Sequence, residues 1–339
     1  MADSAGGDDA GLPLPLLKLL SDGRSHAGEW LARELGVTRA AVWKQARRLR
    51  AAKITVLSDR HGYRLAEPLQ LLDDRAILRE LDTDLRARIA DLEVLAGVDS
   101  TNQQILRRIG RRPATGVGGA LVCLAERQSA GRGRRGRAWW SPFGSNLYLT
   151  VGWPMAGGAA TLAGLSLAVG ACLAEALEAI DIQPIGLKWP NDLLVDGRKI
   201  GGILVELRGD ALGPCWVVVG VGLNLNMMDD GQAIDQPWTS ARRVCGRPVD
   251  RNLVAGRALQ GLLMLLGNYE QDGFAAWQAA WQDRNLLLGR QVVVQGDGSS
   301  LAGCVLGVAA DGALRLQTAA GEVRVSSGEV SVREALAAD

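Results

Sequence analysis

Apolar positions near the N-terminus recur with the spacing of short helices. After Thr38, which we expect to cap a helix, Val42, Ala46 and Leu49 fall at i, i+4 and i+7 and predict one buried stripe. Two shorter helical patterns precede this helix and two β-like runs follow it, at residues 16–23, 27–35, 54–58 and 62–66. The order helix, helix, helix and hairpin predicts a winged helix-turn-helix.

Beyond a linker that begins at Pro68, strand-like runs alternate with helical patterns. The strand candidates are 92–98, 119–126, 146–153, 203–207 and 215–224, and the helix candidates are 101–110, 160–180 and 250–283. This alternation predicts a central α/β domain built around a mixed sheet. From about residue 286 the pattern changes to short strands with glycine turns, which predicts a small antiparallel β barrel.

The chain is therefore expected to be α+β with several domains. We expect a disordered leader over 1–11, the winged helix-turn-helix over 12–68, the central domain over 75–284 and the barrel over 286–336.

One stretch also permits a membrane interpretation, because no charged residue occurs between Ala138 and Ala174. Alanine and glycine dominate it, and Glu175 and Glu178 follow on the same predicted helix, so a closely packed core helix is favoured. No export signal is recognisable, and the five scattered cysteines form no disulfide framework or zinc pattern. We expect a cytoplasmic protein without a bound metal or a membrane anchor.

Charge changes this picture in one region only. The 339 residues carry 38 Lys and Arg against 37 Asp and Glu, so any basic surface must be local. Residues 14–60 hold ten basic against four acidic residues, and the basic positions of the third helix point away from its buried stripe. Those positions are the candidates for DNA contact, namely Arg39, Lys44, Arg47 and Arg48.

The segment AGRGRRGRAWWSPFG, residues 130–144, places arginines between glycines and follows them with two tryptophans. Guanidinium groups on a glycine-rich backbone suit phosphate or carboxylate, and an exposed tryptophan suits a purine ring. The alternative is a solvated surface loop. The spacing is not that of a Walker P-loop.

Two further segments carry polar residues at predicted turns. In GLKWPNDLLVDGRKIGGILVE, residues 186–206, the turns at 190–192 and 196–198 bring Lys188, Asp192 and Lys199 together. In VDSTNQQIL, residues 98–106, three small polar residues open a helix, where they form either an N-cap or a polar ligand seat. Both segments also fit ordinary turn and cap chemistry. The stretch GVGLNLN at 220–226 lacks the third glycine and the helix of a dinucleotide fold.

Taken in chain order, the motifs at 98–106, 130–144 and 186–206 resemble those of biotin protein ligases. With the helix-turn-helix before them and GEVSVR near the end, the resemblance runs from about residue 14 to 333 and indicates the bifunctional type that joins a ligase and a biotin-operon repressor. Each motif alone is weak, whereas the set is specific. Ala138 departs from the pattern, since many relatives have a basic residue there.

The resemblance implies a synthetase-like catalytic domain and an SH3-like barrel. It implies that ATP, with Mg²⁺, activates biotin as biotinyl-5′-AMP, and that biotin then passes to a lysine of a biotin carboxyl carrier protein such as that of acetyl-CoA carboxylase. No cofactor would be held permanently. The residues that match the family's biotin and adenylate positions are Ser100, Thr101, Asn102, Gln128, Arg132, Gly133, Arg134, Trp139, Asn191, Lys199, Gly202, Gly220, Gly222 and Asn224.

For catalysis the resemblance points to Lys188, Asp192, Arg132 and Lys199, with Trp139 stacking on adenine. Operator binding usually takes two helix-turn-helix copies, so a homodimer on operator DNA is expected. Two alternatives remain: a lipoate or octanoyl ligase, and a biotin-sensing transcription factor with weak or no ligase activity.

Overall fold

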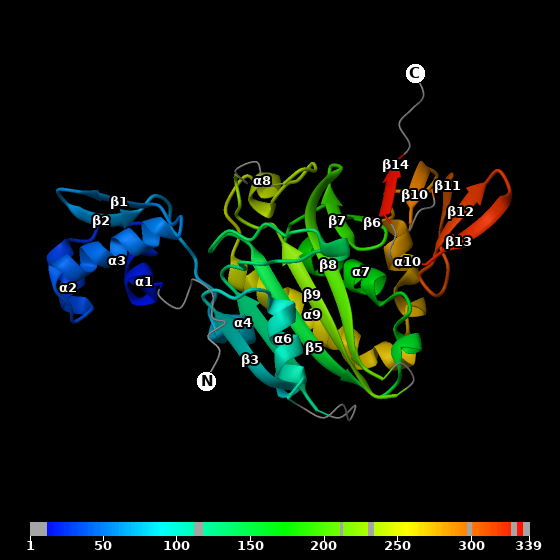
Figure 1. The fold of residues 1–339 in the computed structure, drawn as a ribbon, viewed down its shortest axis with the longest axis horizontal. Helices are drawn as coiled ribbons and strands as arrows, with labels where there is room; N and C mark the ends of the chain where they lie inside the picture. The colour runs from blue at the N-terminus through cyan, green and yellow to red at the C-terminus, as the bar shows by residue number, and fades with distance from the viewer. Residues whose placement is uncertain are drawn as a thin grey trace, which may run out of the picture.

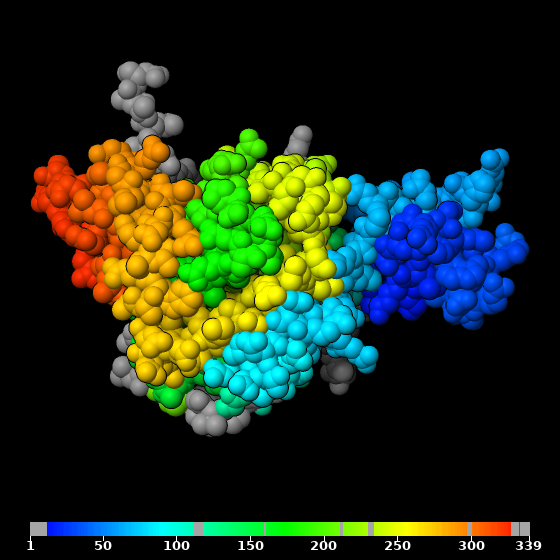
Figure 2. All heavy atoms as spheres, turned by 180° about the vertical axis from the view of Figure 1, so that it is seen from behind, coloured from blue at the N-terminus to red at the C-terminus, as the bar shows by residue number. Residues whose placement is uncertain are grey.

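The computed structural model describes residues 12–111, 118–210, 213–229, 234–296, 300–326 and 331–334. An N-terminal helical part, a central sheet with helices and a C-terminal β part follow one another along the longest axis (Figure 1). Seen from behind, the first and last parts lie at opposite ends of the molecule (Figure 2). The expected leader, 1–11, lies outside the described residues.

The N-terminal part is the predicted winged helix-turn-helix. Thr38 caps its third helix, because its side chain accepts a hydrogen bond from the Ala41 amide at 3.2 Å. Val42, Ala46 and Leu49 are fully buried, as their spacing predicts. The elements are α1 Leu14–Leu20, α2 Gly28–Glu34, α3 Arg39–Ala51, β1 Val56–Asp59 and β2 Gly62–Leu65.

A seven-stranded sheet forms the centre, in the order β3-β4-β5-β9-β8-β7-β6. Only β3 and β4 pair in parallel, and the other neighbours are antiparallel. This confirms a mixed sheet. The strands are β3 Ile89–Leu95, β4 Ala120–Ala125, β5 Leu147–Met155, β6 Gly186–Lys188, β7 Asp192–Val195, β8 Arg198–Gly209 and β9 Cys215–Leu223.

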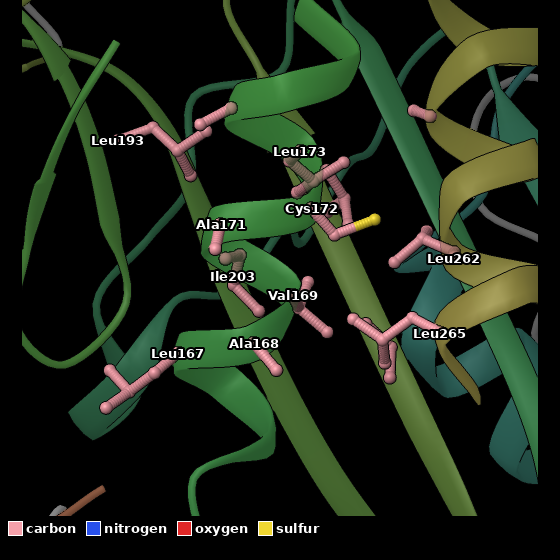
Figure 3. Packing of buried hydrophobic residues seen from close by; sticks show 14 of the residues in the cluster. Leu167, Ala168, Val169, Ala171, Cys172, Leu173, Leu193, Ile203, Leu262 and Leu265 are labelled. Atoms are coloured by element: carbon pink, nitrogen blue, oxygen red, sulfur yellow. The ribbon is translucent and has the colours of Figure 1, made fainter. Parts of the chain in front are cut away.

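Helices cover both faces of this sheet. On one face α6, Thr101–Ile109, packs Ile105 and Ile109 against Trp216 and Val218 of β9. On the other face lie α7, Leu165–Glu178, and α9, Arg251–Asp272, whose side chains interdigitate (Figure 3). The remaining helices are α4 Asp74–Arg79, α5 Thr83–Ala87, α8 Ala241–Cys245, α10 Ala275–Asp283 and the 3₁₀ turns η1 Arg134–Gly136 and η2 Ala159–Leu162.

The uncharged stretch forms β5 and α7, and α7 is buried along nearly all of its length. Among the described residues no helix is both long and apolar enough to cross a membrane. The single helix predicted over 160–180 is wrong in one respect: Gly164, at φ +74°, separates η2 from α7. Gly273 likewise divides the helix predicted over 250–283 into α9 and α10.

The C-terminal part is a five-stranded antiparallel sheet in the order β13-β12-β11-β10-β14. Its buried residues continue the apolar core of the central part, whereas the N-terminal part has a core of its own. Near the turn before β12, the Gly312 carbonyl accepts a hydrogen bond from the Trp189 indole at 3.1 Å. The strands are β10 Gln291–Gln295, β11 Ser300–Val308, β12 Leu314–Thr318, β13 Gly321–Val325 and β14 Ser331–Glu334.

Candidate functional site

A cavity of about 1210 Å³ opens in the central part, and residues of all three parts line it. Ala52 and Lys53 come from the N-terminal part and Val332 from the C-terminal sheet. All but one of the ligand and catalytic residues expected from the sequence lie in its lining: Ser100, Thr101, Asn102, Gln128, Arg132, Gly133, Arg134, Trp139, Lys188, Asn191, Asp192, Lys199, Gly202, Gly220 and Gly222. Three motifs far apart in sequence therefore meet around one space.

Asn224 is the exception. It is 3% exposed and does not line the cavity. Its side-chain amide donates to the Thr239 carbonyl at 3.1 Å, and its backbone amide donates to Ile200 at 2.8 Å. Asn224 thus holds the segment that carries Pro237, one of the wall residues, against β8.

The polar segment at the start of α6 forms one wall. Ser100 occupies the N-cap position, but its side chain accepts no hydrogen bond from the helix, so it does not cap α6 in the expected way. The Thr101 amide donates to Gln128 Oε1 at 2.9 Å, and the Thr101 hydroxyl lies 3.1 Å from the same oxygen. Gln128 follows the end of β4, so this contact ties the start of α6 to the segment that leads into the arginine-rich hairpin.

Just before this wall, Asp99 binds Arg107 through two hydrogen bonds, at 2.6 and 2.8 Å. These bonds lower the pKa of Asp99 from its usual value, with help from the Ser100 amide. Because the folded pKa is lowered, the stabilisation is present at neutral pH and is lost as pH falls through that lowered pKa. The ion pair ties the last turn of α6, which carries Arg107, to the residue just before the N-cap of the helix.

The arginine-rich segment folds into a small hairpin over the cavity. The Gly133 amide donates to Arg137, and the Trp139 amide donates to Gly131, each at 2.8 Å. A side chain at Gly131 would stand 2.7 Å from the Trp139 carbonyl, so only glycine fits there. The hairpin carries Arg132 and Arg134 to the cavity together with the indole of Trp139.

Trp139 lies on a surface made by two glycines. A Cβ at Gly222 would be 2.6 Å from its ring, and one at Gly202 would be 3.2 Å away. Lys199 Nζ is 5.5 Å from the ring centroid, within cation–π range. The indole N–H is buried against β9 and finds no acceptor among the described residues.

The hairpin of β6, β7 and β8 supplies the charged wall. Lys188 stands opposite Asp192 across β6 and β7, and Lys199 Nζ lies 2.6 Å from Asp192 Oδ1. The predicted convergence of these three residues is confirmed. Asn191 points its amide to the Ile203 carbonyl at 2.8 Å, which holds the turn against β8.

Charge in the cavity is mostly positive. Within the described residues, Lys188 and Arg132 have no carboxylate partner, whereas Lys199 is paired with Asp192. No group of three or more His, Cys, Asp or Glu side chains suited to a metal occurs in the part of the chain that the structure describes. The arrangement suits an anionic ligand.

Sequence reasoning missed several contributors to this cavity, among them Lys53, Asp235 and Val332. Lys53 and Val332 reach it from the flanking parts, and Asp235 lines it from the segment before Pro237. No local pattern marks them, because their placement depends on how the three parts pack. Their only sequence signal is that Lys53 belongs to the basic N-terminal region.

A second candidate surface lies on α3. The four basic residues expected to contact DNA are exposed, and Arg39 also forms an ion pair with Glu29 at 3.0 Å. Trp43, which the pattern of basic residues does not single out, is 47% exposed on the same face and lies 4.9 Å below the Arg47 guanidinium.

Sequence comparison agrees with this division into parts. Residues 95–224 match the Biotin/lipoate A/B protein ligase family, residues 287–333 match the Biotin protein ligase C terminal domain, and residues 14–64 match an HTH domain. The chain is similar to the bifunctional ligase/repressor BirA of Salmonella typhimurium. The two are 38% identical over 96% of this chain and 99% of that protein.

Two further similar proteins align with only about 70% of this chain. The biotin--[acetyl-CoA-carboxylase] ligase of Paracoccus denitrificans is 33% identical over 70% of this chain and 98% of its own. The structure of the biotin protein ligase from Aquifex aeolicus in complex with biotin and ATP matches with a TM-score of 0.61 and 28% identity. That match covers 73% of this chain and all of that one.

Proposed function

Because the chain belongs to the biotin protein ligase family and has the helix-turn-helix of its bifunctional ligase/repressor members, we propose that it joins biotin to a carrier protein and represses transcription. The observation that carries the ligase half is that the three motifs meet around the same cavity. Biotin and ATP are its substrates, as in the related complex from Aquifex aeolicus.

In the first step a biotin carboxylate oxygen attacks the α-phosphorus of ATP, and pyrophosphate leaves. Bringing two unit charges to 4 Å costs about 4 kcal/mol at an effective dielectric near 20, so the reaction needs cations. Lys188, Arg132 and Lys199 line the cavity and supply them. They stabilise the charge that develops at phosphorus without a covalent enzyme intermediate.

Mg²⁺ enters with ATP in this proposal. Since the described residues offer no three-ligand metal cluster, the phosphates would provide most of its ligands. Asp192 and Asp235 are the carboxylates of the cavity lining that could add to them. The ion would contribute charge neutralisation at the phosphates.

In the second step the amine of the carrier lysine attacks the carbonyl of the mixed anhydride, and AMP leaves. The amine must lose a proton, and Asp192 is placed to orient it or accept that proton. The anhydride must also be kept from water until the carrier arrives. The hairpin of residues 131–139 lies over the cavity and serves as its cover.

One experiment tests the ligase half. Purified protein is mixed with ATP, Mg²⁺ and either biotin or lipoate, and the quenched products are measured by mass spectrometry. We expect biotinyl-5′-AMP and pyrophosphate in the biotin sample alone. An adenylate of lipoate would favour a lipoate ligase, and no adenylate at all would leave a biotin sensor without ligase activity.

The repressor half rests on the exposed basic face of α3, with Arg39, Lys44, Arg47 and Arg48 contacting operator DNA. Each chain carries one such helix in the part described, so a two-fold operator requires a homodimer. We propose that the dimer forms through the central part when the adenylate is bound, and that the protein acts in the cytoplasm.

A further inference from the structure

Behind the polar wall of the cavity runs a chain of hydrogen bonds that includes two residues of no assigned role, Thr150 on β5 and Glu206 on β8. Asn102 Nδ2 donates to Glu206 Oε2 at 2.7 Å. Thr150 Oγ1 donates to Asn102 Oδ1 at 2.7 Å and lies 2.8 Å from Thr101 Oγ1. The one hydrogen of the Thr101 hydroxyl is shared between two acceptors within reach, Thr150 Oγ1 and, at 3.1 Å, Gln128 Oε1.

At each end of this series of hydrogen bonds stands a group that can only accept or only donate. A carboxylate only accepts, so Glu206 forces the nitrogen of the Asn102 amide toward itself and the oxygen toward Thr150. A backbone N–H only donates, so the Thr101 amide forces Gln128 to present its oxygen. The side-chain amides of Asn102 and Gln128 therefore each have a single orientation, and the Thr150 hydroxyl donates its one hydrogen to Asn102 Oδ1.

The orientation of the two amides decides which of their hydrogen-bonding groups remain free for a ligand. The second acceptor of the Asn102 nitrogen is the Leu204 carbonyl, at 3.4 Å, so only its carbonyl oxygen remains for a ligand. The Gln128 nitrogen donates one hydrogen to Ser141 at 3.2 Å and keeps the other. The wall thus offers an acceptor at Asn102 and a donor at Gln128.

We propose that Glu206 and Thr150 are positioning residues that set this donor and acceptor pattern for the ring of the substrate. The inference rests on the proposed ligase function. The cyclic urea of biotin carries N–H donors beside a carbonyl acceptor and complements the pattern. The dithiolane ring of lipoate has neither group, so the same pattern discriminates against it.

The residues that set this donor and acceptor pattern are buried. Thr150 is fully buried, and Thr101 and Asn102 are each 4% exposed, so water cannot replace a lost partner at low cost. Asn102 also lies so close to β9 that a Cβ at Gly220 would stand 2.1 Å from its oxygen. If the Asn102 amide were rotated by 180°, its N–H would face an N–H of the ligand, and no hydrogen bond would form between them.

The test uses paired variants of the full chain and isothermal calorimetry with biotin, desthiobiotin and ATP as separate ligands. Thr150→Val keeps the shape and removes the hydroxyl, whereas Thr150→Ser keeps the hydroxyl. Glu206→Leu and Glu206→Gln form a second pair, in which Gln retains an oxygen acceptor. Melting temperatures report on folding.

Thr150→Val and Glu206→Leu should weaken binding of biotin and of desthiobiotin by roughly tenfold or more, since each leaves a buried polar group unpaired. ATP binding should change less than twofold. Thr150→Ser and Glu206→Gln should recover most of the loss. If Glu206→Leu does not fold, the Thr150 pair decides.

Wild-type biotin affinity in Thr150→Val, or an equal loss for biotin and ATP, would overturn the inference and leave the ligase function standing. Failure of the unaltered chain to bind biotin would overturn the proposed function itself, and this inference with it.

Discussion

Two glycines on β9 show how single residues shape the cavity. Gly220 leaves room for Asn102 and Gly222 leaves room for the Trp139 ring, although only one residue separates them. Alternate residues of a strand point to the same face, so both lie under the cavity floor. The missing side chains set Asn102 and Trp139 next to each other along one strand, where we propose that the ring and the nucleotide of the substrate bind.

Gly220→Ala should therefore weaken biotin binding and Gly222→Ala should weaken ATP binding, each by roughly tenfold, because the new methyl group displaces a neighbour in a packed wall. Calorimetry with each ligand measures both effects. Gly170→Ala on α7 is the matched control: its new Cβ would meet Leu187 at an ordinary 3.5 Å, and neither affinity should change. The same loss of both ligands in Gly220→Ala and Gly222→Ala would contradict this division of the floor.

At the scale of elements, the start of α9 holds the linker that follows the winged helix-turn-helix. Arg251 is fully buried and donates to Glu126 at 2.8 Å, and also to the carbonyls of Gln70 and Asn146, both at 2.7 Å. The other Glu126 oxygen accepts the Leu72 amide. One ion pair thus joins the linker, the end of β4 and the start of β5.

Removal of one partner leaves a buried charge, so Arg251→Met should lower the free energy of unfolding by about 3–5 kcal/mol. Replacing both partners, Arg251→Met with Glu126→Leu, should recover much of that loss. Denaturant titration measures the free energy of unfolding of each variant. The pair Arg242–Glu67, which is more open to solvent, is the control, since Arg242→Met should cost less than about 1 kcal/mol. A cost for Arg251→Met as small as this would show that the buried pair does not hold the linker.

The α3 helix makes a prediction about DNA. Arg47→Ala with Arg48→Ala should weaken binding to duplexes enriched from a randomised pool on the protein with biotin and ATP. The slope of log affinity against log salt should become shallower by about 0.9 for each phosphate that the variant no longer neutralises. Arg290→Ala, an exposed change in the C-terminal part, should alter neither quantity. An unaltered slope in the double variant would place the DNA-binding surface elsewhere.

Elements with strong local patterns could be predicted from the sequence, and those set by packing could not. The α3 stripe of Val42, Ala46 and Leu49 is confirmed because burial on a helix follows its period. The break at Gly164 is not predictable in this way, because the surrounding residues remain apolar on both sides. Glu206 resembles an ordinary strand residue, since its link to Asn102 spans 104 positions of sequence.

For the whole molecule, the cavity is where the three parts meet. The central part supplies its floor and charged walls, and Lys53 and Val332 complete it from the two flanking parts. The C-terminal sheet also holds Trp189, the residue after Lys188, through the Gly312 carbonyl. Such sharing gives the DNA-binding part and the C-terminal part direct contact with the space in which we place the adenylate.

The most direct test of the central claim is transfer to a carrier. The protein is incubated with ATP, Mg²⁺ and the apo carrier domain of acetyl-CoA carboxylase, with biotin or lipoate in parallel, and the intact mass of the carrier is measured. We predict that one biotinyl group is added to one lysine in the biotin sample, only when ATP is present. An unmodified carrier, or one modified by lipoate instead, would contradict the account.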